Sequence, residues 1–305
     1  MSTTGAPNLR SIRPLDAGWL LELWNESAVH DPLTPELLAE KIWDDDDFRP
    51  AESFVALHGD EAAGFIVGVV RTGGDSPIGY VKMLAVVPER QRLGIGSLLL
   101  DAVKSAMARR GVKALRLGES LPNYLVPGVD ARYESALRFF DSKGFRRFDE
   151  ACNMTADLRH ERFDTEKDEH ELARFGIRVR RAESRDNEVL QQFLQRHWPP
   201  WQHEVQCSLG RARPAVHLAF RGEELLAFSA YDGNNAGCGS FGPMGTAPSA
   251  RGLGIGRVLL RRCLRDIRAM GFKQATIPWV APTGFYEHHV GATIARRFHR
   301  YQKEL

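Results

Sequence analysis

The chain has 305 residues, of which 43% are hydrophobic and 26% are charged, the balance of a soluble globular protein. This length predicts about two domains. The formal net charge is +2, which argues against a nucleic-acid-binding protein because such proteins carry a strongly basic surface, and the short apolar runs argue against a membrane-spanning helix.

The cysteines and the first residues favour a cytoplasmic protein. The chain holds four cysteines without a CxxC pair, which we expect to be reduced. They are Cys152, Cys207, Cys238 and Cys263. Residues 1–7 are polar and lack the apolar core of a secretory signal peptide.

In the first half, short apolar runs separated by glycine-containing turns predict antiparallel strands. The predicted strands are residues 9–13, 54–57, 64–71, 80–87 and 114–118. A helix is expected to begin after Asp16. A second, longer helix has the apolar stripe Leu99, Val103 and Met107 and ends at Gly111, because glycine tolerates the left-handed conformation that stops a helix.

The second half repeats this order. The predicted strands are residues 177–181, 216–220, 225–231, 240–246 and 274–279. A helix follows Ser184, and a longer one has the stripe Leu260, Cys263 and Ile267 and ends at Gly271. The charged segment 159–171 lacks apolar periodicity. We therefore expect a first domain at residues 1–160, a linker at 161–175, in which a short helix is possible, and a second domain at 176–305.

Residues 88–100 recur nearly unchanged as residues 248–260, with Leu-Gly-Ile-Gly at the same place in both. A strand, a tight turn and a helix in succession present free backbone N–H groups at the helix N-terminus, which favours phosphate. The alternative is that the glycines only form the turn. Neither copy matches the dinucleotide fingerprint or the P-loop.

The pattern [Gln/Arg]-x-x-Gly-x-Gly, placed between a strand and a long helix, resembles the acetyl-CoA motif of the GNAT acetyltransferase superfamily. The order of the flanking elements is similar as well, so the resemblance covers almost the whole chain as two domains. It implies an α/β (α+β) fold of two GNAT-like domains, each with a mixed, mostly antiparallel sheet flanked by helices. It also implies acyl transfer from acetyl-CoA, most often to an amine.

The resemblance implies that the strand before each motif binds the pantetheine arm and polarises the thioester carbonyl, while the motif amides bind the pyrophosphate. The residues so implied in the second domain are Met244, Gly245, Thr246, Arg251, Gly252, Leu253, Gly254, Ile255, Gly256 and Arg257. Those in the first domain are Leu84, Ala85, Val86, Gln91, Arg92, Leu93, Gly94, Ile95, Gly96 and Ser97. A backbone N–H aimed at a developing oxyanion is worth about 3 kcal/mol.

The two halves differ where family members carry Ala-x-x-x-Tyr before a glycine. The tyrosine of that motif protonates the departing thiolate. The first half has Phe140 at this position, whereas the second half has Tyr286, with Pro282 in place of the alanine and one extra residue before the glycine. We expect Tyr286 to be a general acid, the second domain to be catalytic and the first to be degenerate. The alternative for Tyr286 is a packing role.

The base that accepts the proton of the amine stays open. Candidates are Glu287 and the histidines His203, His288 and His289 in the second domain, and Glu119 in the first. Adjacent histidines on a helix point about 100° apart and cannot easily share an ion, so we expect no metal and favour solvated histidines.

Two further segments are candidates for the acceptor site. Residues 198–203 read Trp-Pro-Pro-Trp-Gln-His, either a rigid aromatic surface for the acceptor or a turn that caps the core. The acidic run 43–47 favours a solvated loop over a site that attracts an amine.

These observations predict an acetyl-CoA-dependent N-acetyltransferase that acts on an amine of a small molecule or peptide, in the second domain. The alternatives are activity in the first cleft or a non-catalytic acyl-CoA-binding or assembly module. We expect neither nucleic acid nor a membrane as partner, and a monomer or homodimer.

Overall fold

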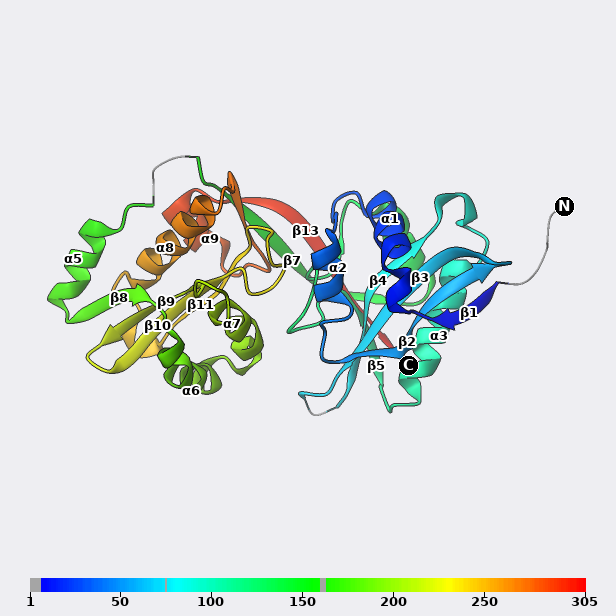
Figure 1. Cartoon of the computed structure of the whole chain (residues 1–305), viewed down its shortest axis with the longest axis horizontal. Coiled ribbons are helices and arrows are strands. Elements are labelled where there is room, and N and C mark those ends of the chain that lie inside the picture. Colours follow the sequence, from blue (N-terminus) through cyan, green and yellow to red (C-terminus); the bar gives the residue numbers. More distant parts are fainter. Residues whose placement is uncertain (1–6, 75, 160–162) are drawn as a thin grey trace. The chain divides into compact units, whose positions relative to one another are not determined.

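The computed structural model describes residues 7–74, 76–159 and 163–305. The chain forms two compact units (Figure 1). Unit 1 contains Met1–Glu150 and Phe298–Leu305, and unit 2 contains Ala151–Arg297. Both are of mixed α/β type, as expected from the sequence. In the described part of the chain, no helix is long and apolar enough to cross a bilayer.

In unit 1, four antiparallel strands lie in chain order, and a fifth is parallel to the fourth. The strands are β1 (Asn8–Ser11), β2 (Phe48–His58), β3 (Glu61–Arg71), β4 (Ile78–Val86), β5 (Ala114–Leu117) and the short β6 (Val129–Asp130). The helices are α1 (Ala17–Ser27), α2 (Pro35–Lys41), α3 (Ile95–Ala108) and α4 (Glu134–Ser142).

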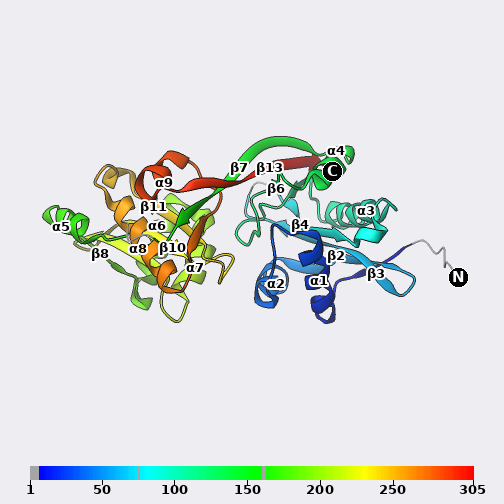
Figure 2. The same cartoon turned by 90° about the horizontal axis from the view of Figure 1, so that it is seen from above.

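The sheet of unit 1 lies between two helical layers, with α1 and α2 on one face and α3 on the other (Figure 2). Side chains of a strand alternate between faces. Accordingly Phe65 and Val67 pack with α1 and α2, whereas Ile66 packs with α3 and α4. Buried on both faces, β3 reads as a nearly continuous apolar run.

Unit 2 has a four-stranded antiparallel sheet in the order β11-β10-β9-β8. Its strands are β8 (Ile177–Arg181), β9 (Val216–Arg221), β10 (Glu224–Tyr231) and β11 (Phe241–Thr246), followed by β12 (Gln274–Ile277). Its helices are α5 (Glu166–Arg174), α6 (Asn187–His197), α7 (Gln202–Leu209), α8 (Ile255–Ala269) and α9 (Thr283–Val290). Helices α6 and α7 pack on one face of the sheet and α8 on the other.

Short 3-10 turns precede corresponding helices in the two units. They are η1 (Pro14–Asp16) and η3 (Ser184–Asp186) before α1 and α6, η2 (Pro88–Arg90) and η5 (Pro248–Ala250) before α3 and α8, and η4 (Pro199–Trp201) before α7. The turns before α1 and α6 and those before α3 and α8 therefore recur in the two units, whereas η4 has no described counterpart before α2.

Each unit takes strand residues from the other half of the sequence. This exchange was not predicted from the sequence. Strand β7 (Arg146–Asp157) enters unit 2 at Ala151, and its end pairs with β12. Strand β13 (Thr293–Glu304) enters unit 1 at Phe298, and its end pairs antiparallel with β5. Unit 1 thus ends ten residues earlier than expected and also contains residues 298–305.

The expected linker, residues 161–175, also differs from the structure. Residues 161 and 162 lie outside the described part, as do residues 1–6, on which the signal-peptide argument depended. The remainder includes α5, which belongs to unit 2 and whose Leu172 is buried in the core with Ile177 and Val258. A single apolar anchor in a highly charged helix gives no periodic signal, which is why the sequence favoured a linker.

Candidate functional site

The repeated motif forms the same turn in both units. Gly94 precedes α3 with φ of 85°, and Gly254 precedes α8 with φ of 82°. The residue two positions earlier is also left-handed in both, as Arg92 with φ of 64° and Gly252 with φ of 83°. Only glycine adopts this conformation without strain. The turn leaves the first N–H groups of α3 and α8 without a helical partner, as a phosphate site requires.

The strand before each turn has one open backbone edge beside the motif. Strand β4 pairs with β5 only as far as Val81, although its other edge stays paired with β3 up to Val86. In unit 2, Met244–Thr246 pair with β10, whereas the contact with β12 is a single bridge at Ser240. Among the described strands, residues 84–86 and 244–246 have no partner on the second edge. Both units therefore present free backbone where a thioester arm is expected.

The structure places Phe140 and Tyr286 in corresponding positions. A Cβ atom added at Gly96 would lie 3.4 Å from the ring of Phe139, and one at Gly256 would lie 3.4 Å from the ring of Phe285. The residue after each phenylalanine packs against it. The ring centroids of Phe139 and Phe140 lie 5.2 Å apart, as do those of Phe285 and Tyr286. The turn and its aromatic neighbour are thus the same, and only the hydroxyl group differs.

The phenol of Tyr286 is protonated at any ordinary pH. Its ring packs against Phe241 and Phe285 in the core of unit 2, and burial raises its pKa to about 12. A thiol has a pKa near 8.5, so complete proton transfer from this phenol to a thiolate is uphill. The hydroxyl is better suited to donate a hydrogen bond to a departing sulfur than to give up its proton.

Three of the four candidate bases of unit 2 lie on α9, and the fourth, His203, lies on α7. Glu287 and His288 are exposed and His289 is half-buried, and all three line a cavity of about 470 Å³ together with Arg261. Burial lowers the pKa of His289, and the charges of His288, Arg257 and Arg261 lower it further. His203 is exposed on α7, 3.9 Å from the sulfur of Cys207. None of these contacts singles out one base.

Glu119, the candidate base of unit 1, follows β5 and is buried. Its carboxylate accepts a hydrogen bond of 3.2 Å from Arg116 and another from Arg300. Burial raises its pKa, and the two arginines oppose this shift. A carboxylate held by two guanidinium groups has its lone pairs engaged, which favours a structural role for Glu119.

Aromatic rings cover the sheet of unit 2 on the face opposite α8. Trp198 and Trp201 stack with their centroids 5.3 Å apart and an angle of 20° between the planes, and both pack on Phe228. A Cβ atom at Gly245 would lie 2.5 Å from the ring of Trp198, so glycine is required there. The tryptophan therefore rests directly on the strand that presents the open edge.

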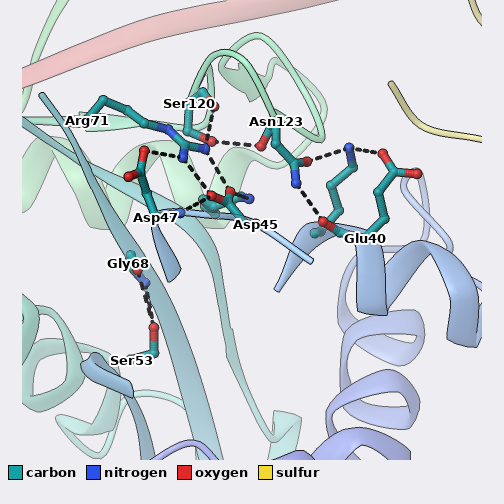
Figure 3. Close-up of polar contacts among 10 residues, drawn as sticks. Glu40, Asp45, Asp47, Ser53, Gly68, Arg71, Ser120 and Asn123 are labelled. Atoms are coloured by element: carbon teal, nitrogen blue, oxygen red, sulfur yellow. Dashed lines mark hydrogen bonds and ion pairs between the residues drawn. The ribbon is translucent and has the colours of Figure 1, made fainter. Parts of the chain in front are cut away.

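The corresponding face of unit 1 holds a network of buried charges (Figure 3). Asp45 accepts hydrogen bonds of 2.6 and 2.7 Å from Arg71 and another from Lys82, and the side chains of Asp45 and Lys82 are each only 1% exposed. Nearby, the ammonium of Lys41 contacts Glu40 at 2.6 Å and Asn123 at 2.8 Å. The solvated acidic loop expected at residues 43–47 is wrong for Asp45, because these cations draw it into the interior.

Burial and mutual attraction shift the pKa values of both partners of this ion pair. Burial would raise the pKa of Asp45, but the charges of Arg71 and Lys82 outweigh it and lower the pKa to about 2. Burial lowers the pKa of Lys82 to about 7, against the attraction of Asp45. No sequence motif predicted a role for these residues. A signal existed, because Lys82 interrupts the otherwise apolar strand 80–87.

Among the described residues, no group of three or more His, Cys, Asp or Glu side chains is placed to hold a metal ion. The oxygen- and nitrogen-bearing groups around the two turns are backbone amides, arginines and single carboxylates. Free backbone amides at a helix N-terminus, with arginines nearby, favour an anion.

The comparisons with known proteins agree with this geometry. Residues 19–125 and 178–291 each match the model of the Acetyltransferase (GNAT) family. The chain belongs to the GNAT family of acetyltransferases. No curated protein matches the chain.

Solved structures share the fold along the whole chain. A GCN5-related glucosamine N-acetyltransferase region of a fungal multi-domain GH3 β-N-acetylglucosaminidase has a TM-score of 0.85 at 20% identity, over 99% of this chain and 38% of that one. A GCN5-related N-acetyltransferase from Sphaerobacter thermophilus has a TM-score of 0.69 at 18% identity, over 98% and 95% of the chains. A tandem GNAT protein from the clavulanic acid biosynthesis pathway has 0.69 at 15%, over 98% of each. This chain thus spans well under half of the fungal chain, and these identities indicate the fold alone.

Proposed function

We propose that the chain is an N-acetyltransferase that moves the acetyl group of acetyl-CoA to an amine of a small molecule or peptide, and that unit 2 carries the reaction. The observation that carries this proposal is that both units have the same turn but differ in the aromatic residue at one corresponding position. In unit 2 the residue next to the phenylalanine that faces the turn is Tyr286, which carries a hydroxyl group, whereas in unit 1 it is Phe140, which has none.

The residues of unit 2 would act in a single displacement. The N–H groups at the start of α8 bind the pyrophosphate, and the open edge of residues 244–246 orients the thioester and polarises its carbonyl. The neutral amine attacks the carbonyl carbon, so a C–N bond forms and the C–S bond breaks. Tyr286 donates a hydrogen bond to the sulfur as it leaves, and the proton lost by the amine passes to solvent or to a base on α9.

Charge supports unit 2 as the working unit. The first turns of α8 carry Arg257 and Arg261, where α3 carries Ser97 and Asp101. Coenzyme A is polyanionic, so these arginines favour it. On the other side of the sheet, the face of unit 1 is filled by the ion pair of Asp45 and Lys82.

The acceptor would meet the aromatic surface of unit 2. A flat pair of tryptophans suits the apolar face of a sugar ring or a cationic amine. The fungal region that shares the fold is named a glucosamine N-acetyltransferase. Glucosamine is therefore the first acceptor to test, alongside a panel of amines and N-terminal peptides.

The decisive experiment measures thiol release from acetyl-CoA with an active acceptor. We expect Tyr286→Phe to lower kcat about 100-fold, because the departing thiolate loses its donor. The matched control is Tyr80→Phe, which removes a phenolic hydroxyl from β4 of unit 1 and should leave kcat unchanged. A loss in the control instead would assign the reaction to unit 1, and binding of acetyl-CoA without thiol release for any amine would favour a binding module.

A further inference from the structure

The first half of helix α8 carries three arginines, whereas the corresponding helix of unit 1 carries none. Arg257, Arg261 and Arg262 take the places of Ser97, Asp101 and Ala102 on α3. Arg257 and Arg261 share one counterion: Asp168 of α5 accepts 2.8 Å and 3.2 Å hydrogen bonds from them. Two guanidinium groups on one carboxylate leave this face of α8 positive.

The arginines form a row that leads away from the phosphate turn. Arg257 directly follows Gly256, and its Nη2 lies 3.7 Å from the place that a Cβ atom of Gly254 would take. Arg261 comes four residues later, on the same face of the helix and about 6 Å further along its axis. An anion bound at the turn would therefore lie close to Arg257, with Arg261 one helical turn further along α8.

A cavity opens at the far end of this row. It measures about 470 Å³ and is lined by Arg261 of α8, by His288 and His289 of α9, and at its acidic side by Asp164 and Glu287. Burial lowers the pKa of His289, and the neighbouring His288, Arg257 and Arg261 lower it further, against the attraction of Asp168. The cavity thus has the guanidinium group of Arg261 on its α8 side and two imidazole rings on its α9 side.

Coenzyme A carries a third phosphate, a monoester on the 3′ position of its ribose, one sugar ring away from the pyrophosphate. We propose that Arg261 and His289 form the binding site for this 3′-phosphate in unit 2, and that Asp168 holds the guanidinium groups in place until the phosphate replaces it. This inference rests on the proposed function of unit 2.

The chemistry of the groups fits this assignment. A phosphate monoester has close to two negative charges at neutral pH and three acceptor oxygens. A guanidinium group binds such an oxygen pair through two parallel hydrogen bonds, and a neutral imidazole adds a third donor through its one N–H group. Unit 1 offers a carboxylate, Asp101, at the place of Arg261, so the preference for a 3′-phosphate would belong to unit 2 alone.

The test compares coenzyme A with 3′-dephospho-coenzyme A by isothermal titration. These two ligands differ only in the monoester. We expect the wild-type protein to bind coenzyme A about tenfold more tightly, and Arg261→Gln to remove this difference by weakening coenzyme A alone. Arg261→Lys should keep part of it. The matched control is Arg265→Gln, which makes the same change at an exposed position one turn further along α8.

A second pair of variants tests the part given to Asp168. Asp168→Asn frees both arginines and should tighten coenzyme A binding several-fold, whereas Glu166→Gln, exposed on the same helix, should not. Weaker binding in Asp168→Asn would contradict its displacement by phosphate.

The failure of this inference is distinguishable from failure of the proposed function. Equal affinity of the wild-type protein for the two ligands, or a full preference retained in Arg261→Gln, would overturn the 3′-phosphate site while leaving a coenzyme A site in unit 2. Absence of binding of either ligand would overturn the proposed function itself.

Discussion

Units 1 and 2 begin α3 and α8 with the same turn but fill the opposite face of their sheets with different chemistry. Unit 1 buries the ion pair of Asp45 and Lys82 there, and unit 2 stacks Trp198 on Trp201. The turn depends on local backbone geometry, so both copies keep it. The proposed reaction depends on a few side chains outside the turn, and Tyr286, the residue to which it assigns the donor role, has no hydroxyl-bearing counterpart in unit 1. A conserved-looking phosphate turn is therefore weak evidence of activity when taken alone.

The largest expected effect is on stability, and it tests whether residues 298–305 belong to the core of unit 1. Tyr301 lies in the core of unit 1 with Leu117 and Phe140, so Tyr301→Ala should lower the free energy of unfolding by about 3–5 kcal/mol. Hydrogen exchange should show the loss of protection in α3 and β5. Ile294→Ala, at an exposed position of the same strand, is the control. Loss of protection confined to unit 2 would contradict the assignment of residues 298–305 to unit 1.

The buried charges of unit 1 give the next test. Asp45→Ala leaves Arg71 and Lys82 without their shared carboxylate, and breaking a buried pair in this way costs about 3–5 kcal/mol. Lys82→Met should cost less, because Arg71 still holds Asp45 by two hydrogen bonds. Chemical denaturation measures both, with the exposed Asp44→Ala as control. If Lys82→Met proved the more damaging change, the lysine rather than the carboxylate would be the centre of the network.

A matched pair of glycine variants separates folding from function. Gly94→Ala and Gly254→Ala each place a side chain at a left-handed residue, which costs about 1–2 kcal/mol in either unit. If unit 2 carries the reaction as proposed, only Gly254→Ala should also abolish thiol release, because it strains the turn whose amides would hold the pyrophosphate. Equal loss of activity in both variants would show that the two turns act together.

The smallest expected effect is on the alkaline side of the pH–rate profile. The pKa of Tyr286 is raised to about 12, so the phenol keeps its proton at every pH below that value. Deprotonation of the amine speeds the reaction as the pH rises, and Tyr286 should not reverse this gain up to about pH 10. Initial rates with a fixed acceptor measure the profile. A descending limb present in the wild-type enzyme and absent in Tyr286→Phe would show that the phenol ionises earlier.

The repeat, the order of elements and the contrast between Phe140 and Tyr286 were all predictable, because each depends on residues close together in the sequence. The partners of β7 and β13 were not, since alternating side chains predict a strand but not the sheet that it joins. Asp45 was missed for a related reason. An acidic run predicts exposure to solvent unless cations from distant segments pair with it, and here Arg71 and Lys82 pair with Asp45.

The exchange of strand ends has a consequence for synthesis of the protein in the cell. Residues 298–305 leave the ribosome only after the whole of unit 2, so the edge of β5 that pairs with Gln302 and Lys303 stays bare while unit 2 is being made. A bare strand edge invites pairing with other chains. The first unit to be translated is thus the last to be completed, and no single cut between residues 151 and 297 yields two intact halves.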